Sequence, residues 1–409
     1  MIAVDIIIIG GGAAGFFTAI NAVEKNSKLK VLLLERGKDV LTKVKISGGG
    51  RCNVTHAQFE PKELSLNYPR GEKELLGPFH RFMTGDTIEW FEARGIPLKI
   101  EEDGRMFPTS NSSQTIIDLF VSETDRLGID VRRGQSVKSI VRKNDFWSID
   151  TSSDIFLAKK IVMATGSNPK IWQLLAGLGH KIVPPVPSLF TFNIKDGRIV
   201  DLPGVATQAS VKVIDGSGNV SLESEGALLI THWGMSGPAI LKLSAWGARV
   251  LAPTNYHFSI KVNWLETVSE EEALEKLLIL KMSSARQTVF KYAQFDLPKR
   301  LWQSLVQAAG IDATQTWADI SKKKLQNLAN QIVSSHFDVK GKSTFKEEFV
   351  TAGGVDLKEV NFKTFESRLQ KNLYFAGEVL NIDAITGGFN FQNAWTGGYL
   401  AAQALASET

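Results

Sequence analysis

Apolar and polar positions at the start of the chain predict a strand, a helix and a second strand. Val4–Ile9 is a short, β-branched apolar run, which is typical of a strand buried on both faces. Glycines follow between Gly10 and Gly15, and a helical pattern then runs from about residue 13 to residue 25. A second apolar run, KVLLLERG, ends at Glu35. This order predicts a βαβ unit that opens a parallel sheet.

The pattern changes several times in the next part of the chain. Residues 68–99 look helical in part, and SNSSQTIIDLFVSETDRLG predicts a helix with polar N-cap candidates that stops at Gly128. Between Asp130 and Lys159, the segments QSVKSIVRK, FWSIDT and DIFLA predict an antiparallel meander. KIVMATG then predicts a separate buried strand that ends at Gly166.

The second half of the chain divides at a proline-rich boundary, PPVPSLFTF, at residues 184–192. Strand-like runs beyond it suggest a small β domain, and residues 269–334 become helical. Ser269 and Glu272 fit a capping box at the start of this helical part. After about residue 345, short strands and glycine turns return, and an alanine-rich helix follows them.

The composition limits the class of protein but does not identify a binding partner. A chain of 409 residues is too long for one ordinary core, and 43% hydrophobic with 22% charged residues indicates a globular protein. The net charge of +4 suits an anionic small molecule as readily as a nucleic acid. One cysteine excludes a cysteine-pair redox mechanism and favours a reducing compartment. Asp5 and the glycines argue against a signal peptide or membrane span, so we expect a cytoplasmic protein with no membrane partner.

The first glycine turn carries a nucleotide-binding pattern, Gly10-x-Gly12-x-x-Gly15. Such glycines permit a tight turn and close approach to a pyrophosphate, and the helix N-terminus offers free N–H groups to it. The pattern alone is weak, because an accidental turn also fits it. Here the pattern follows a buried strand, and Glu35 comes after it at the spacing that is typical of an acid that binds a ribose. Together these features predict a bound adenine dinucleotide. The Glu35 carboxylate would repel a 2′-phosphate, so NADP is a poor candidate for this pocket.

A second glycine-acid turn, YFAGEV, favours FAD over NAD because it returns late in the chain, before TGGFNFQNAW. A longer cofactor needs one segment for its adenosine end and another for its ribityl and ring end. Glu378 is a candidate for a ribityl or phosphate-proximal hydroxyl. Backbone N–H groups between Gly388 and Phe391 are candidates for the flavin N1/O2 edge. The alternative is two ordinary turns.

Seven segments together carry a family resemblance: DIIIIGGGAAG, SGGGRCNVT, GRMFPTS, ATGS, THWGMSGPA, VTAGGV and LYFAGEVLNIDAITGGFNFQNAWTGG. In this order they resemble the bacterial aminoacetone-oxidase-like FAD flavoproteins of the glutathione-reductase-like superfamily, some relatives of which are linked to the reduction of bile-acid and steroid enones. The resemblance implies an α/β fold with a glutathione-reductase-like FAD-binding Rossmann domain, an inserted β-barrel-like domain and a helical domain. We expect these at residues 1–190 with 345–409, 191–268 with 335–344, and 269–334.

The same resemblance places the first glycine turn and Glu35 on the adenosine diphosphate, the Val137 backbone on the adenine, and the late segment on the flavin. The complete set of expected cofactor-binding residues is Gly10, Gly12, Ala13, Ala14, Gly15, Glu35, Arg36, Lys43, Ser47, Gly48, Gly49, Arg51, Cys52, Asn53, Val137, Thr165, Gly166, Gly377, Glu378, Gly388, Phe389, Asn390 and Phe391.

ISGGGRCNV, at residues 46–54, fits the middle of such a cofactor. Three glycines without Cβ atoms let the backbone pass close to an extended FAD, although a flexible surface turn is the alternative. Arg51 is expected either to offset pyrophosphate charge or to close the loop. Cys52 is expected to be a packing residue near the flavin rather than a catalytic thiol.

The catalytic candidates are His232 and Asn390, with Trp233, Trp395 and Tyr399 as further residues near the expected ring. Hydride transfer at flavin N5 needs positioning more than acid–base residues, and a structural role for His232 is the alternative. No His or Cys spacing suggests a metal site.

The sequence therefore predicts an FAD-dependent oxidoreductase that transfers a hydride between flavin N5 and a small organic substrate, by amine oxidation or enone reduction. A second dinucleotide pattern is absent from the sequence, so NAD(P)H would bind transiently, and O₂ is the other candidate partner. An FAD-dependent RNA-modifying protein and a non-catalytic flavin-binding interaction protein are the alternatives. The run KKK at residues 322–324 is more typical of a solvated face, so no nucleic-acid partner is expected.

Overall fold

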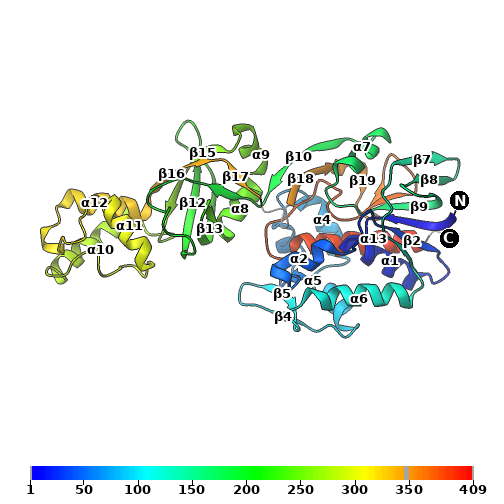
Figure 1. Cartoon of the computed structure of the whole chain (residues 1–409), viewed down its shortest axis with the longest axis horizontal. Helices are drawn as coiled ribbons and strands as arrows, with labels where there is room; N and C mark the ends of the chain where they lie inside the picture. The colour runs from blue at the N-terminus through cyan, green and yellow to red at the C-terminus, as the bar shows by residue number, and fades with distance from the viewer. Residues whose placement is uncertain (1, 345–349, 408–409) are drawn as a thin grey trace. The chain divides into compact units, whose positions relative to one another are not determined.

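The computed structural model describes residues 2–344 and 350–407, and it divides into two compact units (Figure 1). Unit 1 contains residues 1–186 and 346–409, and unit 2 contains residues 187–345. The expected boundary at residue 345 lies outside the described residues. Unit 1 is therefore built from both ends of the chain, and unit 2 is a continuous insertion.

Unit 1 combines a large sheet with helices on its faces. Its helices are α1 (Ala13–Lys25), α2 (Thr42–Gly50), α3 (Pro61–Ser65), α4 (Glu72–Phe79), α5 (Thr84–Glu92), α6 (Ser113–Arg126), α7 (Pro169–Gly177), α13 (Phe389–Ser407) and the 3₁₀ helix η3 (Leu357–Glu359). Its strands are β1 (Ile2–Ile9), β2 (Val31–Leu34), β3 (Thr55–His56), β4 (Leu98–Ile100), β5 (Arg105–Pro108), β6 (Asp130–Arg132), β7 (Ser139–Lys143), β8 (Phe146–Asp150), β9 (Ile155–Met163), β10 (Ile182–Ser188), β18 (Val350–Val355), β19 (Val360–Asn361), β20 (Glu366–Ser367) and β21 (Leu373–Phe375).

The main sheet of unit 1 has the order β19-β20-β21-β9-β1-β2-β6, and β8 pairs with both β9 and β7. The central strands β21, β9, β1, β2 and β6 are parallel, with registers such as Ile7 opposite Leu32 and Ile161. Ile6–Ile9 are buried, as expected for a strand covered on both faces. The predicted βαβ unit is therefore confirmed, and its helix α1 has the predicted bounds.

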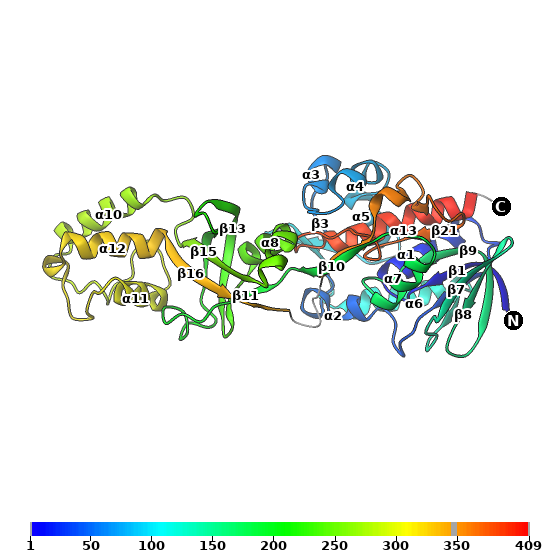
Figure 2. The same ribbon diagram turned by 90° about the horizontal axis from the view of Figure 1, so that it is seen from above.

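The first and last helices of unit 1 pack together. Figure 1 draws α1 in blue and α13 in red side by side, and Figure 2 shows the same pair from above. The last strand of the central sheet, β21, also comes from the C-terminal part of the chain and pairs with β9. Both ends of the sequence thus contribute to one core.

The meander prediction needs one correction. β7 pairs with β8, and β8 pairs with β9, both antiparallel, as expected. DIFLA and KIVMATG, however, belong to one continuous strand, β9, which ends at Met163 rather than at Gly166. Lys160, the first residue of KIVMATG, fits a buried strand because its ammonium donates to the Leu405 carbonyl at 2.9 Å.

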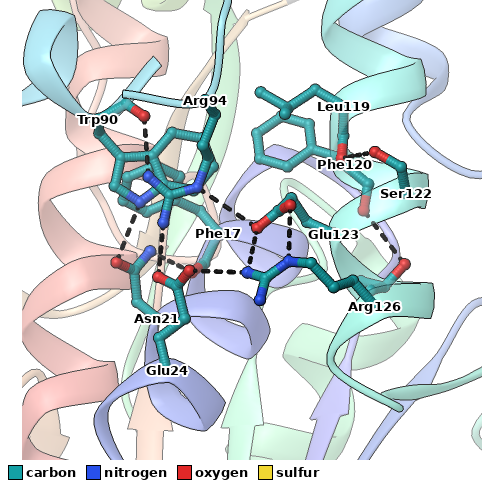
Figure 3. A network of polar contacts seen from close by, with 11 residues as sticks. Phe17, Asn21, Glu24, Trp90, Arg94, Leu119, Phe120, Ser122, Glu123 and Arg126 are labelled. Atoms are coloured by element: carbon teal, nitrogen blue, oxygen red, sulfur yellow. Dashed lines mark hydrogen bonds and ion pairs between the residues drawn. The ribbon is translucent and has the colours of Figure 1, made fainter. Parts of the chain in front are cut away.

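A polar network joins three helices on one side of unit 1 (Figure 3). Arg94, just after α5, contacts Glu24 of α1 at 2.6 Å and Glu123 of α6 at 3.5 Å. Arg126 of α6 contacts the same two carboxylates, and the hydrogen bond from Arg126 is the largest cause of a lowered pKa at Glu123. The Arg94 guanidinium also lies 3.8 Å from the centre of the Trp90 ring. These contacts fix α5 and α6 against α1, which carries the glycine turn.

Unit 2 consists of one antiparallel sheet and a helical part. Its strands are β11 (Thr191–Asn193), β12 (Ala206–Ile214), β13 (Val220–Thr231), β14 (Gly234–Ser236), β15 (His257–Asn263), β16 (Ser335–Lys340) and β17 (Lys342–Ser343). Its helices are α8 (Pro238–Trp246), α9 (Ala248–Leu251), α10 (Glu270–Ser283), α11 (Lys299–Ala308), α12 (Lys322–Val333) and the 3₁₀ helices η1 (Ala252–Thr254) and η2 (Trp317–Asp319).

The sheet of unit 2 has the order β16-β15-β12-β13-β14-β11-β17. β16 and β17 follow one another along the chain with Gly341 between them, so one segment pairs with both ends of the sheet and closes it in the manner of a barrel. In the helical part, Leu301, Trp302 and Leu305 of α11 are fully buried. The Ser269–Glu272 capping box at the start of α10 is confirmed in both directions, at 2.8 and 3.2 Å.

Candidate cofactor site

The glycine turn between β1 and α1 has a closed side and an open side. A Cβ atom on Gly15 would lie 2.0 Å from the Gly10 carbonyl oxygen, and one on Gly10 would lie 2.3 Å from the Ala164 oxygen. Close packing of the turn against β9 therefore requires glycine at these two positions. A Cβ atom on Gly12 would meet no described atom within 4 Å. The space next to Gly12 is free for a ligand.

The N-terminus of α1 faces the same turn. Its first helical bond runs from the Phe16 N–H to the Gly12 carbonyl at 3.1 Å, and Gly12 has no side chain that could cap the helix. Within the described residues, the N–H groups of Ala13 and Ala14 have no hydrogen-bond partner. Free N–H groups and the positive end of the helix dipole favour a bound phosphate.

Glu35 lies directly after β2 and is held by backbone groups. Its Oε2 accepts a hydrogen bond from the Gly11 N–H at 2.8 Å, and its Oε1 accepts one from the Gly37 N–H at 2.7 Å. These bonds fix the carboxylate beside the glycine turn, and each oxygen keeps a second lone pair for a ribose hydroxyl. The structure thus brings Glu35 and the turn together, as the spacing predicted.

A recess opens beside Glu35 at the carboxyl ends of β1, β2 and β9, where parallel sheets bind ligands. Its predicted lining residues are Gly10, Glu35, Arg36, Val137 and Thr165. The sequence prediction did not include Gln135, Ser136, Asn168, Lys170 and Ile171, which line it as well.

The missed residues Asn168 and Lys170 open α7, and a sequence signal for them exists. The Asn168 side chain accepts from the Lys170 N–H at 3.1 Å, and Pro169 occupies the first helical position. An N-cap followed by proline, shortly after the KIVM strand and the turn ATG, indicates another helix N-terminus at this edge of the sheet.

The segment ISGGGRCNV forms an irregular turn at the end of α2, with left-handed backbone at Gly48 and Gly49. A Cβ on Gly48 would lie 2.8 Å from the Phe107 ring, whereas one on Gly49 would meet nothing within 4 Å. Ser47 donates to the Val44 carbonyl at 2.9 Å. The open side at Gly49 leaves its backbone accessible to a ligand.

Arg51 is engaged within the protein. Its Nη1 lies 2.6 Å from Glu101 Oε1, its guanidinium lies 3.9 Å from the centre of the Phe107 ring, and its Nε donates to the Gly48 carbonyl at 3.4 Å. These contacts favour the second of the two expectations, a residue that closes the loop.

Cys52 is buried at 0% exposure and has a φ of +62°. Burial raises the pKa of its thiol to about 12, and a hydrogen bond with Ser47 only partly opposes this. A thiol with this pKa is protonated at neutral pH and is therefore a poor nucleophile. Neighbouring Asn53 is also buried.

The late glycine-acid turn meets the early segments. A Cβ atom on Gly377 would lie 3.2 Å from the Ala14 Cβ, and one on Gly166 would lie 3.9 Å from the Glu378 carboxylate. Glu378 Oε2 also lies 2.7 Å from the Lys43 ammonium of α2. The carboxylate is the largest cause of the raised pKa of Lys43. Four expected cofactor residues thus lie around one end of α1.

The turn before α13 is fixed on several sides. The Asn390 amide accepts from the Ala384 N–H at 3.0 Å and donates to the Ala384 carbonyl at 3.3 Å, so its polar atoms are engaged with the turn. The Tyr68 hydroxyl donates to the Phe389 carbonyl at 2.6 Å. A Cβ on Gly388 would lie 2.5 Å from the Thr55 oxygen. Phe391 stacks on Trp395, with ring centres 5.5 Å apart.

The remaining candidates occupy other places. Trp395 is fully buried and donates to the Val54 carbonyl at 2.9 Å, and Tyr399 stacks on Phe82. His232 and Trp233 belong to unit 2, where they form the exposed turn between β13 and β14. No described group of three or more His, Cys, Asp and Glu side chains could hold a metal ion.

The arrangement in unit 1 fits FAD. It provides an open glycine turn at a helix N-terminus, a fixed carboxylate beside a recess, and a late turn with Glu378 and the start of α13. The fold and the site define a Rossmann-type flavoenzyme, and its cofactor is FAD.

Comparison with known proteins identifies the family. Residues 4–404 match the HI0933-like protein Rossmann domain, so the chain belongs to the HI0933-like family and is an FAD-dependent oxidoreductase. It is 30% identical over 416 residues to a ribosomal RNA dihydrouridine synthase of Haemophilus influenzae, with 98% of each chain covered. It is 26% identical over 407 residues to a 3-dehydro-bile acid delta(4,6)-reductase of Clostridium scindens, again with 98% of each covered.

A solved structure shows the same fold. The 3-ketosteroid delta1-dehydrogenase of Sterolibacterium denitrificans matches with a TM-score of 0.52, 11% identity and full coverage of both chains. Among the described residues, no helix is long and apolar enough to cross a membrane.

Proposed function

We propose that this protein reduces a carbon–carbon double bond conjugated to a carbonyl group, and that its substrate is a uridine of ribosomal RNA. The observation that carries the proposal is the end-to-end similarity to a ribosomal RNA dihydrouridine synthase, at 30% identity and 98% of both chains. An RNA-modifying protein was one of the alternatives that the sequence left open, and the main expectation was a small organic substrate. Amine oxidation, the other expected activity, has no support from the relatives reported above.

The reactions named for the two relatives share one kind of chemistry. In uracil the C5=C6 bond is conjugated to the C4 carbonyl, as the double bonds of an enone are conjugated to its ketone. Reduction adds a hydride at C6 and a proton at C5, so the base gains two electrons and two protons in total. FAD, when bound and reduced, supplies the hydride. A nicotinamide nucleotide is the proposed source of the electrons.

In this proposal, the chain's own residues bind and orient the cofactor. The Glu35 recess and the N-terminus of α1 hold the adenosine diphosphate end, because they offer a carboxylate for hydroxyls and free N–H groups for phosphates. Asn390 is a positioning residue, since both ends of its amide bind the Ala384 backbone. Buried Cys52 stays protonated, because burial raises the pKa of its thiol to about 12, and we assign it a packing role. His232 remains a predicted catalytic residue.

The test uses purified holoenzyme, NADH or NADPH, and deproteinised ribosomal RNA from a strain that lacks the gene. We expect the RNA to gain dihydrouridine, measured by mass spectrometry of digested nucleosides, and the reduced flavin to be reoxidised by RNA under anaerobic conditions. A His232→Gln variant is expected to lower this activity while its FAD content stays unchanged.

A parallel reaction with a 3-oxo-Δ4,6 steroid tests the competing substrate, which the similarity to the bile-acid reductase suggests. Flavin that is reoxidised by the steroid, but not by RNA, would assign the protein to steroid enones and overturn the RNA proposal. The RNA proposal would also be overturned if dithionite-reduced enzyme left the uridines unchanged.

A further inference from the structure

The helical part of unit 2 has one strongly basic end. It consists of five residues, which we call the basic end: Lys281, Arg286, Lys322, Lys323 and Lys324. Lys281 lies near the end of α10, Arg286 follows that helix, and the three consecutive lysines form the first turn of α12. In the sequence these groups are some forty residues apart, so the fold is what brings them together.

Hydrogen bonds show that these segments meet. The Lys281 ammonium donates to the Trp317, Ala318 and Ile320 carbonyls at 3.2, 2.9 and 2.5 Å, directly before α12. The Ala318 N–H donates to the Ala285 carbonyl at 3.0 Å, beside Arg286. The end of α10 therefore lies against the start of α12.

The charges of the basic end are not neutralised locally. None of its five residues forms an ion pair with a carboxylate in the described part of the chain. Lys324 donates to the Gln315 side chain at 2.8 Å, and Lys281 binds carbonyls. Arg286, Lys322 and Lys323 are exposed.

Three consecutive glutamates of this part lie away from the basic end. Glu270, Glu271 and Glu272 occupy the first turn of α10, at its opposite end. Glu270 accepts from Gln326 and Asn330, which lie further along α12 than its lysines. The one carboxylate of η2, Asp319, accepts from the Thr316 hydroxyl at 2.6 Å. The helical part thus carries an acidic end and a basic end.

The lysines of α12 occupy positions at which a positive charge lowers the stability of the helix. A helix N-terminus carries partial positive charge, and acidic side chains in the first turn stabilise it by about 0.3–1 kcal/mol each. The first turn of α12 has no acidic residue and three lysines. Folding alone therefore does not account for this placement, in contrast to α10, which has glutamates at the corresponding positions.

We propose that the basic end of unit 2 binds the phosphate backbone of the ribosomal RNA substrate. This rests on the proposed function, which supplies a polyanion as the partner. Exposed lysine and arginine side chains without an ion-pair partner bind phosphates without reading sequence, so Arg286, Lys322 and Lys323 would hold the RNA while other residues select the uridine. Charge complementarity is the observation that selects RNA as the occupant.

The test compares two charge-matched double variants as full-length holoenzymes. Lys322→Glu with Lys323→Glu changes the basic end. Lys261→Glu with Lys340→Glu changes two exposed lysines on β15 and β16 of the same unit by the same amount. The readouts are the thermal midpoint, the affinity for deproteinised ribosomal RNA, and the dependence of that affinity on salt.

The Lys322/Lys323 variant is expected to bind RNA about tenfold more weakly at ~0.1 M salt, and its log–log salt slope should fall by about two. Its thermal midpoint should not fall, because glutamates suit the start of α12. The Lys261/Lys340 variant is expected to keep the wild-type affinity and slope.

The outcomes separate this proposal from the proposed function. If wild-type enzyme forms dihydrouridine but the Lys322/Lys323 variant binds RNA normally, the basic end is not the RNA surface. If both double variants weaken binding equally, general charge rather than this face binds RNA, and the proposal fails. If wild-type enzyme neither binds nor reduces RNA, the proposed function itself fails.

Discussion

Single residues in this site combine structural and binding roles. Glu35 accepts N–H bonds from Gly11 and Gly37, so the carboxylate holds the glycine turn and the following loop in place. The same group faces the recess that we assign to the adenosine end of FAD. A change at Glu35 therefore affects both the shape of the turn and the contact with a ribose.

Glu35→Ala is expected to weaken FAD retention by more than tenfold. The reason is the loss of charge-assisted hydrogen bonds, which contribute about 1.5–3 kcal/mol each. Fluorescence titration of apoprotein with FAD measures the effect. Glu35→Gln is the matched control, since its amide oxygen can still accept one backbone N–H, and we expect intermediate affinity. Wild-type retention in the alanine variant would remove Glu35 from the ribose.

Cys52 gives a prediction in the alkaline range. Because burial raises the pKa of the folded thiol to about 12, from 9.0, the unfolded chain loses this proton first. The contribution to stability is complete below about pH 9 and is lost as the pH rises toward 12. Relative to Cys52→Ala, the wild-type free energy of unfolding should fall by about 1.4 kcal/mol per pH unit in this window.

Urea unfolding of both proteins at pH 8 and pH 10.5 measures this difference. Parallel pH dependence of the two proteins would mean that the thiol is not the titrating group. Cys52→Ser should also retain flavin turnover, because the buried side chain does not reach substrate.

Sequence reasoning at the residue scale succeeded where spacing follows from local geometry. The distance from Gly15 to Glu35 is one helix and one strand, so the two were predicted to meet. Arg51 and Glu101 come from segments without such a relation, and their 2.6 Å ion pair could not be predicted. The pairing of Lys43 with Glu378 likewise depends on the tertiary fold, although both residues had been singled out.

At the scale of elements, the turn between β1 and α1 separates requirements of folding from requirements of binding. Gly10 and Gly15 are needed because neighbouring backbone oxygens leave no room for a Cβ atom. Gly12 has no such neighbour, so only a ligand would give a reason for its small size. The three glycines of one motif therefore have two different physical causes.

Gly12→Ala is expected to fold with a stability close to that of wild-type apoprotein but to bind FAD at least tenfold more weakly. Gly15→Ala should lower the thermal midpoint of the apoprotein, because its Cβ would overlap the Gly10 oxygen. Differential scanning calorimetry and FAD titration separate the two effects. Normal FAD affinity in the Gly12 variant would mean that the cofactor does not occupy this space.

Elements were predictable where one signal governed them, and less so where two signals competed. The bounds of α1 and the capping box of α10 followed from glycine punctuation and cap residues. β9 was divided in the prediction, and two lysines interrupt its apolar pattern, whereas sheet pairing with both β1 and β8 keeps it continuous. The segment from Gly388 to Phe391 was predicted to open the last helix, and α13 does begin at Phe389.

At the scale of the whole molecule, the expected cofactor residues are confined to one of the two units. All of them lie in unit 1, from Gly10 to Phe391, whereas His232 lies in unit 2. A ligand stabilises the part of a protein whose folded form binds it. FAD should therefore protect unit 1 directly.

Hydrogen exchange followed by mass spectrometry tests this division. Adding FAD to the apoprotein is expected to slow amide exchange in β1, α1 and the start of α13, and to leave the buried helix α11 of unit 2 unchanged. Equal protection of α11 would show that the two units open as one cooperative body rather than separately.

The two-ended construction of unit 1 has a consequence for protein synthesis. Unit 2 is continuous and emerges from the ribosome as a complete sequence, while β1, α1 and β9 still await β21 and α13. The helix α13, which packs on α1, is made after the whole of unit 2. Nascent chains should therefore acquire their flavin only after unit 2 has been made, and the exposed β9 edge of the unfinished sheet must be kept from pairing with other chains until then.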